Sequence, residues 1–140
     1  YELERILEAS ELASDRSPGN LDRLVRLLDH PDPGVRYWAA VGCSALAGAA
    51  LPAGPALLRS LADGSPCVRT AAAEALCRMG EQGPAVKTLR KELASASLLA
   101  ALHAADSLNF AQVPLDPLSR SLVKGVGGRL NRAYALNAFR

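Results

Sequence analysis

The chain has 140 residues, of which 26 are Ala and 24 are Leu, whereas the β-branched and aromatic residues that strands favour are scarce, which excludes an all-β sandwich or barrel. Its 16 basic and 14 acidic residues give a net charge of +2, too little to indicate nucleic-acid binding by itself. No uninterrupted apolar run approaches the ~18 residues of a membrane span, so we expect none.

The first predicted helix covers residues 1–16 and carries apolar residues at Leu3, Ile6 and Leu7, spaced for one helical face. It ends before the turn at residues 17–20, where we expect Asn20 to cap the next helix. Residues 1–32 hold four basic and eight acidic residues, and no acid follows position 116. The chain is therefore acidic at its front and basic at its back.

A pattern recurs after 33 residues: Asp32-Pro33-Gly34-Val35-Arg36-Tyr37-Trp38-Ala39-Ala40 returns as Ser65-Pro66-Cys67-Val68-Arg69-Thr70-Ala71-Ala72-Ala73. Each copy starts with a helix-capping residue and a Pro at the first helical position, and a shorter amphipathic helix precedes it. Two weaker copies follow. In the last copy we interpret residues 125–128 (Gly-Val-Gly-Gly) as the turn between its two helices. The second of these helices places Arg132 at the repeated arginine position and Phe139 on the apolar stripe. We predict an all-α fold, an α-solenoid of about four antiparallel helix pairs (20–50, 55–80, 84–110 and 115–140) preceded by one N-terminal helix, within a single domain.

The two strong copies resemble HEAT repeats of the short bacterial kind, which are also grouped with phycobilisome-lyase-type repeats. The residues that carry the resemblance are Asp32-Pro33-x-Val35-Arg36-x-x-Ala39-Ala40 and Ser65-Pro66-x-Val68-Arg69-x-x-Ala72-Ala73, with a weaker echo at Asn131-Arg132-x-x-Ala135-Leu136. The resemblance covers about residues 20–140. It implies a helical-repeat fold and says little about function.

A narrower resemblance involves residues 1–9, 11–13 and 30–42, whose order is similar to the C-terminal extension of some bacterial sulfatases; residues 133–138 also fit. It implies a non-catalytic piece of a longer, sulfatase-like protein. The sulfatase nucleophile motif, Cys/Ser-x-Pro-x-Arg, is absent, because Pro66 precedes Cys67 here. No sulfatase residue carries over, and we expect no enzymatic activity from this piece.

Arg36, Arg69 and Arg132 occupy one position in successive copies, while the third copy has Leu98 there. We favour a structural arginine ladder, in which each guanidinium pairs with carboxylates or carbonyls of a neighbouring turn. An anion-binding stripe is the alternative.

An apolar contact patch is predicted on the concave surface, and it indicates a protein partner, either a parent catalytic domain or another subunit. Its candidate residues are Tyr37, Val41, Leu99, Leu102 and Leu136. The alternative is scattered surface hydrophobes. We expect Trp38 to be partly buried.

The sequence predicts no cofactor, metal or catalytic site. His103 and Asp106, spaced i, i+3 on one predicted helix, are expected on the same inner face of the solenoid as Glu74. They do not complete a tetrahedral zinc set, and no nucleophile or oxyanion donor is evident beside them. The three cysteines are odd in number and lack CxxC spacing, so we expect free thiols, with Cys67 an inert loop residue.

The leading functional hypothesis is a non-catalytic protein-interaction scaffold. The alternative is a nucleic-acid-binding solenoid that uses the Arg-rich residues 120–140. A scaffold of the bilin-lyase kind is disfavoured by the few aromatic residues. The sequence leaves the compartment, cytoplasmic or periplasmic, open.

Overall fold

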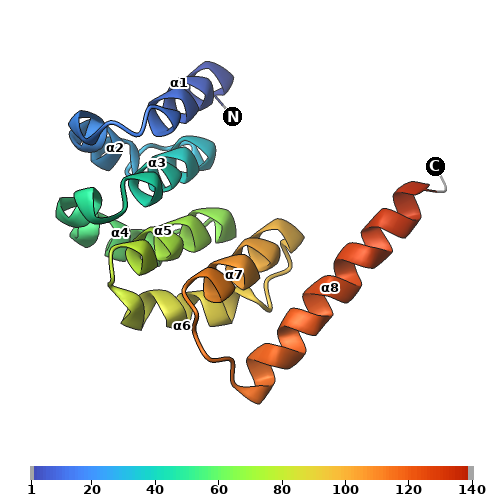
Figure 1. Ribbon diagram of the computed structural model, residues 1–140. Helices are drawn as coiled ribbons and strands as arrows, with labels where there is room; N and C mark the ends of the chain where they lie inside the picture. Colours follow the sequence, from blue (N-terminus) through green and yellow to red (C-terminus); the bar gives the residue numbers. More distant parts are fainter. Residues whose placement is uncertain (1, 139–140) are drawn as a thin grey trace.

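The computed structural model describes the backbone of residues 2–138 and the side chains of residues 2–133 (Figure 1). Every regular element in this part of the chain is helical, which confirms the all-α prediction. The elements are α1 (Leu3–Ser14), η1 (Pro18–Asn20), α2 (Leu21–Leu27), α3 (Pro33–Leu46), η2 (Ala47–Ala53), α4 (Gly54–Ser60), α5 (Pro66–Arg78), α6 (Gln82–Glu92), α7 (Leu98–Phe110) and α8 (Pro117–Ala138), where η marks a 3₁₀-helix.

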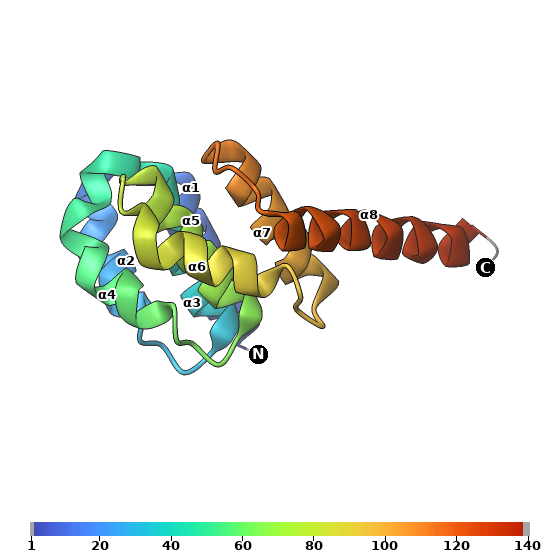
Figure 2. The ribbon, with the colours of Figure 1, turned by 90° about the horizontal axis from the view of Figure 1, so that it is seen from below.

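The helices form two layers. In one layer α1, α3, α5 and α7 pack side by side in that order, and α2, α4 and α6 lie in the other (Figures 1 and 2). Each of α2, α4 and α6 therefore forms a pair with the helix that follows it. The leading helix α1 stacks on α3 as the second helix of a pair would. This stacking confirms the prediction of an α-solenoid.

Small residues let the stacked helices approach closely. Ala39, Ala72 and Ala101 are fully buried between neighbouring helices, where a larger side chain would push the helix axes apart. Two glycines of α3 mark equally close approaches: an added Cβ would lie 2.7 Å from a methyl of Ile6 at Gly34 and 2.7 Å from a methyl of Leu24 at Gly42. The alanine bias of the sequence thus reflects interhelical packing as well as helix propensity.

The two strong repeats begin their second helices differently. Asp32 accepts hydrogen bonds from the backbone N–H of Gly34 at 2.7 Å and of Glu2 at 2.6 Å. Ser65 occupies the corresponding place before α5, but its side chain makes no capping hydrogen bond. Instead Asp63 accepts from the N–H of Ser65 at 2.8 Å. The expectation that the Ser65 side chain caps α5 is therefore wrong.

The prediction for Asn20 is also wrong. Residues 18–20 form a 3₁₀ turn that runs directly into α2, and the Asn20 side chain makes no cap. Because the backbone N–H groups at this junction already have 3₁₀ partners, such as Ser17 O for Asn20 N–H, no side-chain oxygen is needed there.

Three helices, α1, α5 and α7, are followed at the same place by a residue of positive φ, which after α1 is Arg16 (φ +50°). Gly80 (φ +89°) follows α5, and the N–H of the next residue donates to the Leu76 carbonyl at 2.9 Å. Gln112 (φ +53°) takes the same place after α7, with the matching hydrogen bond to the Leu108 carbonyl at 3.2 Å. Glycine adopts this conformation without steric cost, so Gln112 carries backbone strain that Gly80 avoids.

The predicted fourth helix pair is wrong. Residues 117–138 form the single helix α8, which continues through the expected turn at residues 125–128. Its first half packs on the solenoid through the buried Ser119 and Val126, and its second half extends away from the stack (Figures 1 and 2). Glycine costs a helix about 1 kcal/mol relative to alanine but does not end it. The side chain of Leu136 and all of Phe139 lie outside the described residues.

One stretch, Pro33–Ser60, departs from our expectation about membrane spans. Its 18-residue window has a mean hydropathy of 1.5, which meets the length and composition of a span. In the structure this stretch comprises α3, η2 and α4, and 44% of the window is buried inside the molecule. Because core helices pass the same test, the stretch is weak evidence for a membrane span.

Candidate functional site

Arg36 joins the first repeat to the second. Its Nε and Nη2 donate to the two carboxylate oxygens of Asp63, at 2.7 and 3.0 Å. Its Nη1 donates to the carbonyls of His30 and Pro31, both at 2.8 Å. The guanidinium therefore bridges the loop before its own helix and the loop before α5.

Arg69 repeats this arrangement one pair further along. Its Nε donates to Glu92 Oε1 at 2.6 Å, and its Nη1 donates to the Asp63 carbonyl at 2.7 Å. Glu92, the last residue of α6, is only 2% exposed, so loss of this partner would leave a buried carboxylate without a cation. Both guanidinium groups point at the chain's own acceptors, which supports the structural ladder over an anion-binding stripe.

The ladder also perturbs Asp63. Burial by itself would raise the pKa of this carboxyl, but the hydrogen bonds from Arg36 and from the Ser65 N–H outweigh burial and lower the pKa below its ordinary value of 3.8. Asp63 is therefore held in its charged form, as a partner of the guanidinium should be.

Arg132 does not join the ladder, because it lies exposed on α8 rather than on a second helix of a fourth pair. Another residue of α8, Arg129, reaches back to the solenoid. Its Nη1 and Nη2 donate to the carbonyls of Ser95 and Ala96 at 2.8 and 2.9 Å. The sequence pattern did not identify Arg129, since its contact depends on α8 being one continuous helix.

The predicted apolar patch is only partly a free surface. Leu99 is 67% exposed, whereas Tyr37, Val41 and Leu102 are half-buried, and the first two of these pack against the core. The side chain of Leu136 lies outside the described residues. Leu99 is thus the most accessible member of the described patch.

Aromatic rings show that α3 and α7 approach each other across α5. The Tyr37 ring meets Trp38 edge-on, with centroids 5.5 Å apart, and meets the His103 ring edge-on at 6.5 Å. Trp38 is partly buried, as expected. Burial raises the pKa of Tyr37, and nearby Cys67 and Glu74 add to the effect. We call the side of α3, α5 and α7 that carries Tyr37, Glu74 and His103 the inner face.

A polar cluster lies beside the rings. Glu74 Oε2 is 2.5 Å from His103 Nε2, and Arg78 Nε donates to Glu74 Oε1 at 3.0 Å. The Arg78 guanidinium lies 4.1 Å from the centre of the Phe110 ring. The hydrogen bond with His103 lowers the pKa of Glu74 in opposition to its burial, and Arg78 contributes further. The cluster fastens α5 to α7 and keeps Glu74 charged.

These residues border a hollow of about 440 Å³ between the C-terminal halves of the two helices, which we call the α5–α7 hollow. Ser107 also lines it; this residue is 3% exposed and its Oγ has no hydrogen-bond partner. The residues that line the hollow are Glu74, Arg78, His103, Asp106, Ser107, Asn109 and Phe110. Sequence reasoning grouped Glu74, His103 and Asp106 but missed Arg78, Ser107 and Phe110. The i, i+3, i+4, i+7 spacing of residues 103, 106, 107 and 110 was the available signal.

The cluster has no metal-binding arrangement. Among the described residues, no group of three or more His, Cys, Asp or Glu side chains is placed to hold a metal ion. Cys43 and Cys77 are buried, Cys67 is half-buried, and all three are free thiols. Burial raises the pKa of Cys43 to about 11, so this thiol is unreactive at neutral pH.

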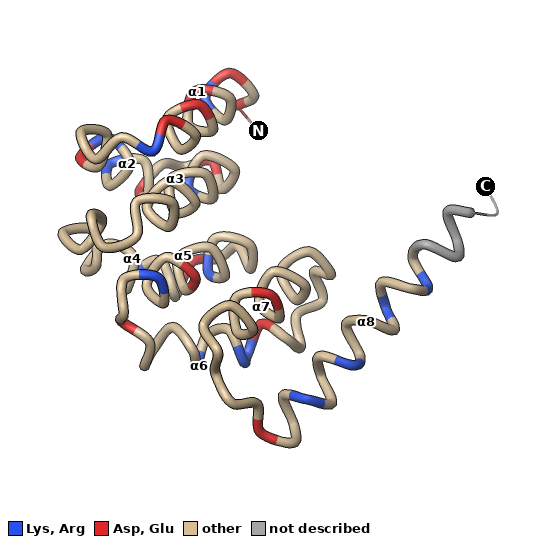
Figure 3. Tube along the Cα trace, viewed as in Figure 1, with Lys and Arg blue, Asp and Glu red and all other residues tan. Residues whose placement is uncertain are grey.

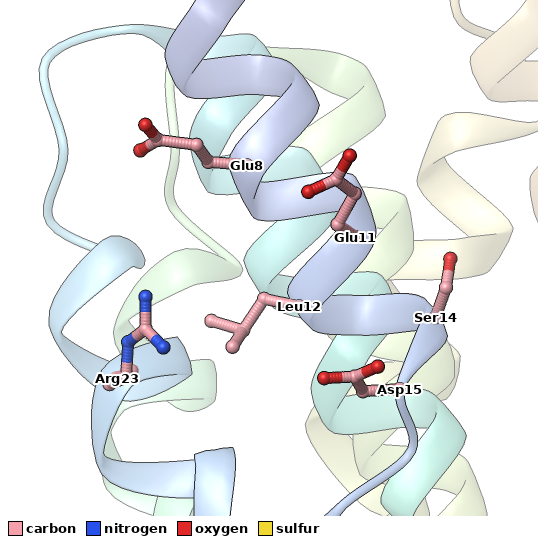
Figure 4. Close-up of a pocket in the computed structure, with 6 residues that line it drawn as sticks. All are labelled: Glu8, Glu11, Leu12, Ser14, Asp15 and Arg23. Atoms are coloured by element: carbon pink, nitrogen blue, oxygen red, sulfur yellow. The ribbon is translucent and has the colours of Figure 1, made fainter.

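A second hollow, of about 500 Å³, lies between α1 and α2 (Figure 4). It is lined by the carboxylates of Glu8, Glu11 and Asp15, with Leu12 pointing toward Arg23 of α2. Its acids are exposed to solvent. It therefore lacks the desolvated polar groups that fix a ligand in a binding pocket.

The two layers of stacked helix pairs, joined by arginines at a repeated position, define an α-solenoid built from helical repeats. The family model for HEAT repeats matches residues 4–77, more than half of the chain, and the protein therefore belongs to the HEAT repeat family. A comparison with curated proteins gave no match. HEAT repeats are generally protein-interaction scaffolds. The match carries no link to sulfatases.

Proposed function

We propose that this chain acts as one non-catalytic protein-interaction module, and that its inner face binds a partner protein. The observation that carries the proposal is the exposed Leu99, 67% accessible, which lies one turn before His103 on α7, the residue whose ring meets that of Tyr37. An exposed apolar residue next to aromatic side chains is typical of the centre of a protein interface.

The inner face is also rigid, which favours binding. The ladder ties α3 to the next repeat through Arg36 and Asp63, and His103 and Glu74 tie α5 to α7. A partner that docks on helices already held in place loses less conformational entropy on binding than one that must order a loop.

A photo-crosslinking experiment tests this proposal. A photoreactive phenylalanine analogue is placed at Leu99, on the inner face, and in a matched variant at Leu58 of α4, an exposed leucine of the other layer (43% accessible). In the native host we expect a discrete heavier species from position 99 and none from position 58. The species should be lost when Tyr37→Ala is added. Equal crosslinking from both positions would contradict the proposal.

We further propose a sulfatase-like hydrolase as the parent protein, in which case the partner is its catalytic domain. The support is the similarity of residues 1–9, 11–13 and 30–42 to the C-terminal extension of some bacterial sulfatases. Sequencing the gene upstream of Tyr1 tests it. We expect a Cys/Ser-x-Pro-x-Arg motif within the few hundred residues upstream. Its absence would refute the sulfatase-like parent but not the interaction function.

A second candidate function, nucleic-acid binding, is favoured by α8. Figure 3 shows bases and no acids along the described part of this helix, whereas acids gather on α1. Arg120, Lys124 and Arg132 are exposed on it. Phosphate contacts of this kind weaken steeply with salt. A duplex titration at low salt that shows no retention would eliminate this candidate.

A further inference from the structure

We propose that the α5–α7 hollow receives a basic side chain, a guanidinium or an ammonium group, of the partner protein. This inference rests on the proposed interaction function and names the chemistry that the partner brings to the inner face.

The charges of the hollow favour a cation. Glu74 already pairs with Arg78 at 2.9 Å and with His103 at 2.5 Å. Asp106, one helical turn beyond His103, is exposed and has no ion-pair partner among the described residues. The carboxylate left for an incoming group is therefore that of Asp106, and a basic side chain complements it. An anion would face both carboxylates.

The buried hydroxyl of Ser107 lines the hollow without a partner among the described residues, and a hydroxyl oxygen can accept a hydrogen bond as well as donate one. A serine within a helix ordinarily donates to the carbonyl four residues earlier, as Ser60 and Thr70 do at 3.1 and 2.8 Å. Ser107 makes no such bond, although its Oγ is buried and it lines the hollow. Leaving a buried polar atom unpaired is unfavourable. A guanidinium or ammonium N–H would supply the partner that this oxygen lacks in the described chain.

Phe110 supplies the apolar part of the site. Its ring is 60% exposed although one cation, Arg78, already lies over it. An aromatic ring beside a carboxylate binds the alkyl stem and the charged head of a basic side chain together. The hollow lies on the same helix as Leu99, so a partner seated on the inner face can reach both.

Chemical-shift titration of the isotope-labelled chain tests the proposal. The probes are N-acetyl-arginine amide and N-acetyl-lysine amide, and the controls are the uncharged N-acetyl-norleucine amide and the anionic N-acetyl-glutamate. We expect the cationic probes to shift the backbone resonances of residues 103–110, with dissociation constants of roughly 10–50 mM because one side chain makes few contacts. The arginine and lysine arms tell which cation the hollow prefers.

Two variants assign the effect to the hollow. Asp106→Asn should weaken binding of the cationic probes roughly threefold to fivefold, as loss of an exposed ion pair beside an aromatic ring does. Asp22→Asn, the same change at an exposed acid of α2, should leave binding unchanged. Ser107→Ala should weaken binding while the fold stays intact; a purely structural Ser107 would change stability and leave affinity alone.

The outcomes separate the two proposals. Shifts with the cationic probes that depend on Asp106 support the hollow as a receptor for a basic group. No shifts, equal shifts with the uncharged probe, or shifts with the anion alone would overturn it. None of these results alters the crosslinking from position 99. The crosslinking experiment therefore tests the interaction function independently of the hollow.

Discussion

The pairing of Arg69 with Glu92 makes the sharpest prediction about stability. Glu92 is 2% exposed and accepts a 2.6 Å hydrogen bond from Arg69. Arg69→Met removes that donor and leaves a carboxylate buried without its cation. We expect the free energy of unfolding to fall by about 3–5 kcal/mol, the range found when one partner of a buried ion pair is removed.

The double variant separates the interaction from the loss of either side chain. Replacing both residues, with Arg69→Met and Glu92→Leu, removes the buried charge along with its partner, so the loss should be only about 1–2 kcal/mol. Part of that loss is the hydrogen bond from Arg69 to the Asp63 carbonyl at 2.7 Å. A coupling of at least about 1 kcal/mol is therefore expected between the two sites, even if Glu92→Leu alone costs nothing.

Urea denaturation of the four proteins in the cycle, followed by circular dichroism, measures this coupling. Arg59→Met is the control, because Arg59 and Asp29 form an exposed pair 4.0 Å apart that should contribute less than about 1 kcal/mol. If Arg69→Met costs no more than Arg59→Met, or if the two changes of the cycle are additive, the reasoning about the buried ladder is wrong.

Four further predictions follow from local geometry. Gly42→Ala should cost about 1–3 kcal/mol in a thermal melt, since its Cβ would meet a leucine methyl at 2.7 Å; an unchanged melt would contradict the close packing of α1, α2 and α3. Gln112→Gly should stabilise the chain by about 0.5–1 kcal/mol in urea, because it relieves a φ of +53°; destabilisation would refute the strain. Because the pKa of Asp63 is lowered in the folded state, the unfolded state binds more protons at acid pH. The stabilisation from Asp63 is therefore present above about pH 4 and is lost as pH falls through the folded-state pKa. In urea melts from roughly pH 6 to pH 2, the free energy of unfolding should fall less for Asp63→Asn than for the unsubstituted chain. Cys67 lies in the first turn of α5 and not, as the sequence had indicated, in a loop, and it is half-buried. We therefore expect it to react with an aromatic disulfide reagent in the native state, whereas Cys43, whose pKa burial raises to about 11, should react only on unfolding. Rapid labelling of Cys43 would show that the core opens readily.

The repeat pattern predicted the helical stack well because local and tertiary requirements coincide at its residues. Pro33 and Pro66 begin helices, and the alanines that follow them are buried in the interfaces between helices. A motif that sets both the start of a helix and its packing face is readable from one sequence. Arg36 and Arg69 were readable in part, since their carbonyl acceptor recurs at positions 30 and 63, whereas their carboxylate partners, Asp63 and Glu92, are not at equivalent positions.

The C-terminal part was not predictable in this way. Three glycines within residues 125–128 indicate a turn by local propensity, yet α8 passes through them as a helix. At Gly125 and Gly127 an added Cβ would meet nothing within 4 Å, so no packing requirement explains these two glycines. Local propensity was a poor guide here. Placing a glycine in a helix costs about 1 kcal/mol relative to alanine, and this is less than the free energy lost by breaking the backbone hydrogen bonds of the helix at a turn.

The polar cluster was only half visible for a different reason. Glu74 and His103 are 29 residues apart and meet because α5 and α7 are neighbours in the stack. Their shared face could be inferred from helical spacing. The place of Arg78 over Phe110 depends on side-chain conformation, which helical spacing does not determine. An unpaired hydroxyl such as Ser107 is visible only when every nearby donor and acceptor is in place.

The arginine ladder affects the order in which the repeats unfold. In a stack where each repeat touches only its neighbours, every interface has its own stability. Arg36 and Arg69 strengthen two successive junctions, whereas Leu98 takes the arginine position in the third pair. Hydrogen exchange should therefore begin in α8, proceed through α7, and reach α3 and α5 last. Unfolding would therefore begin at the basic end, in α8, while the first two repeats stay folded.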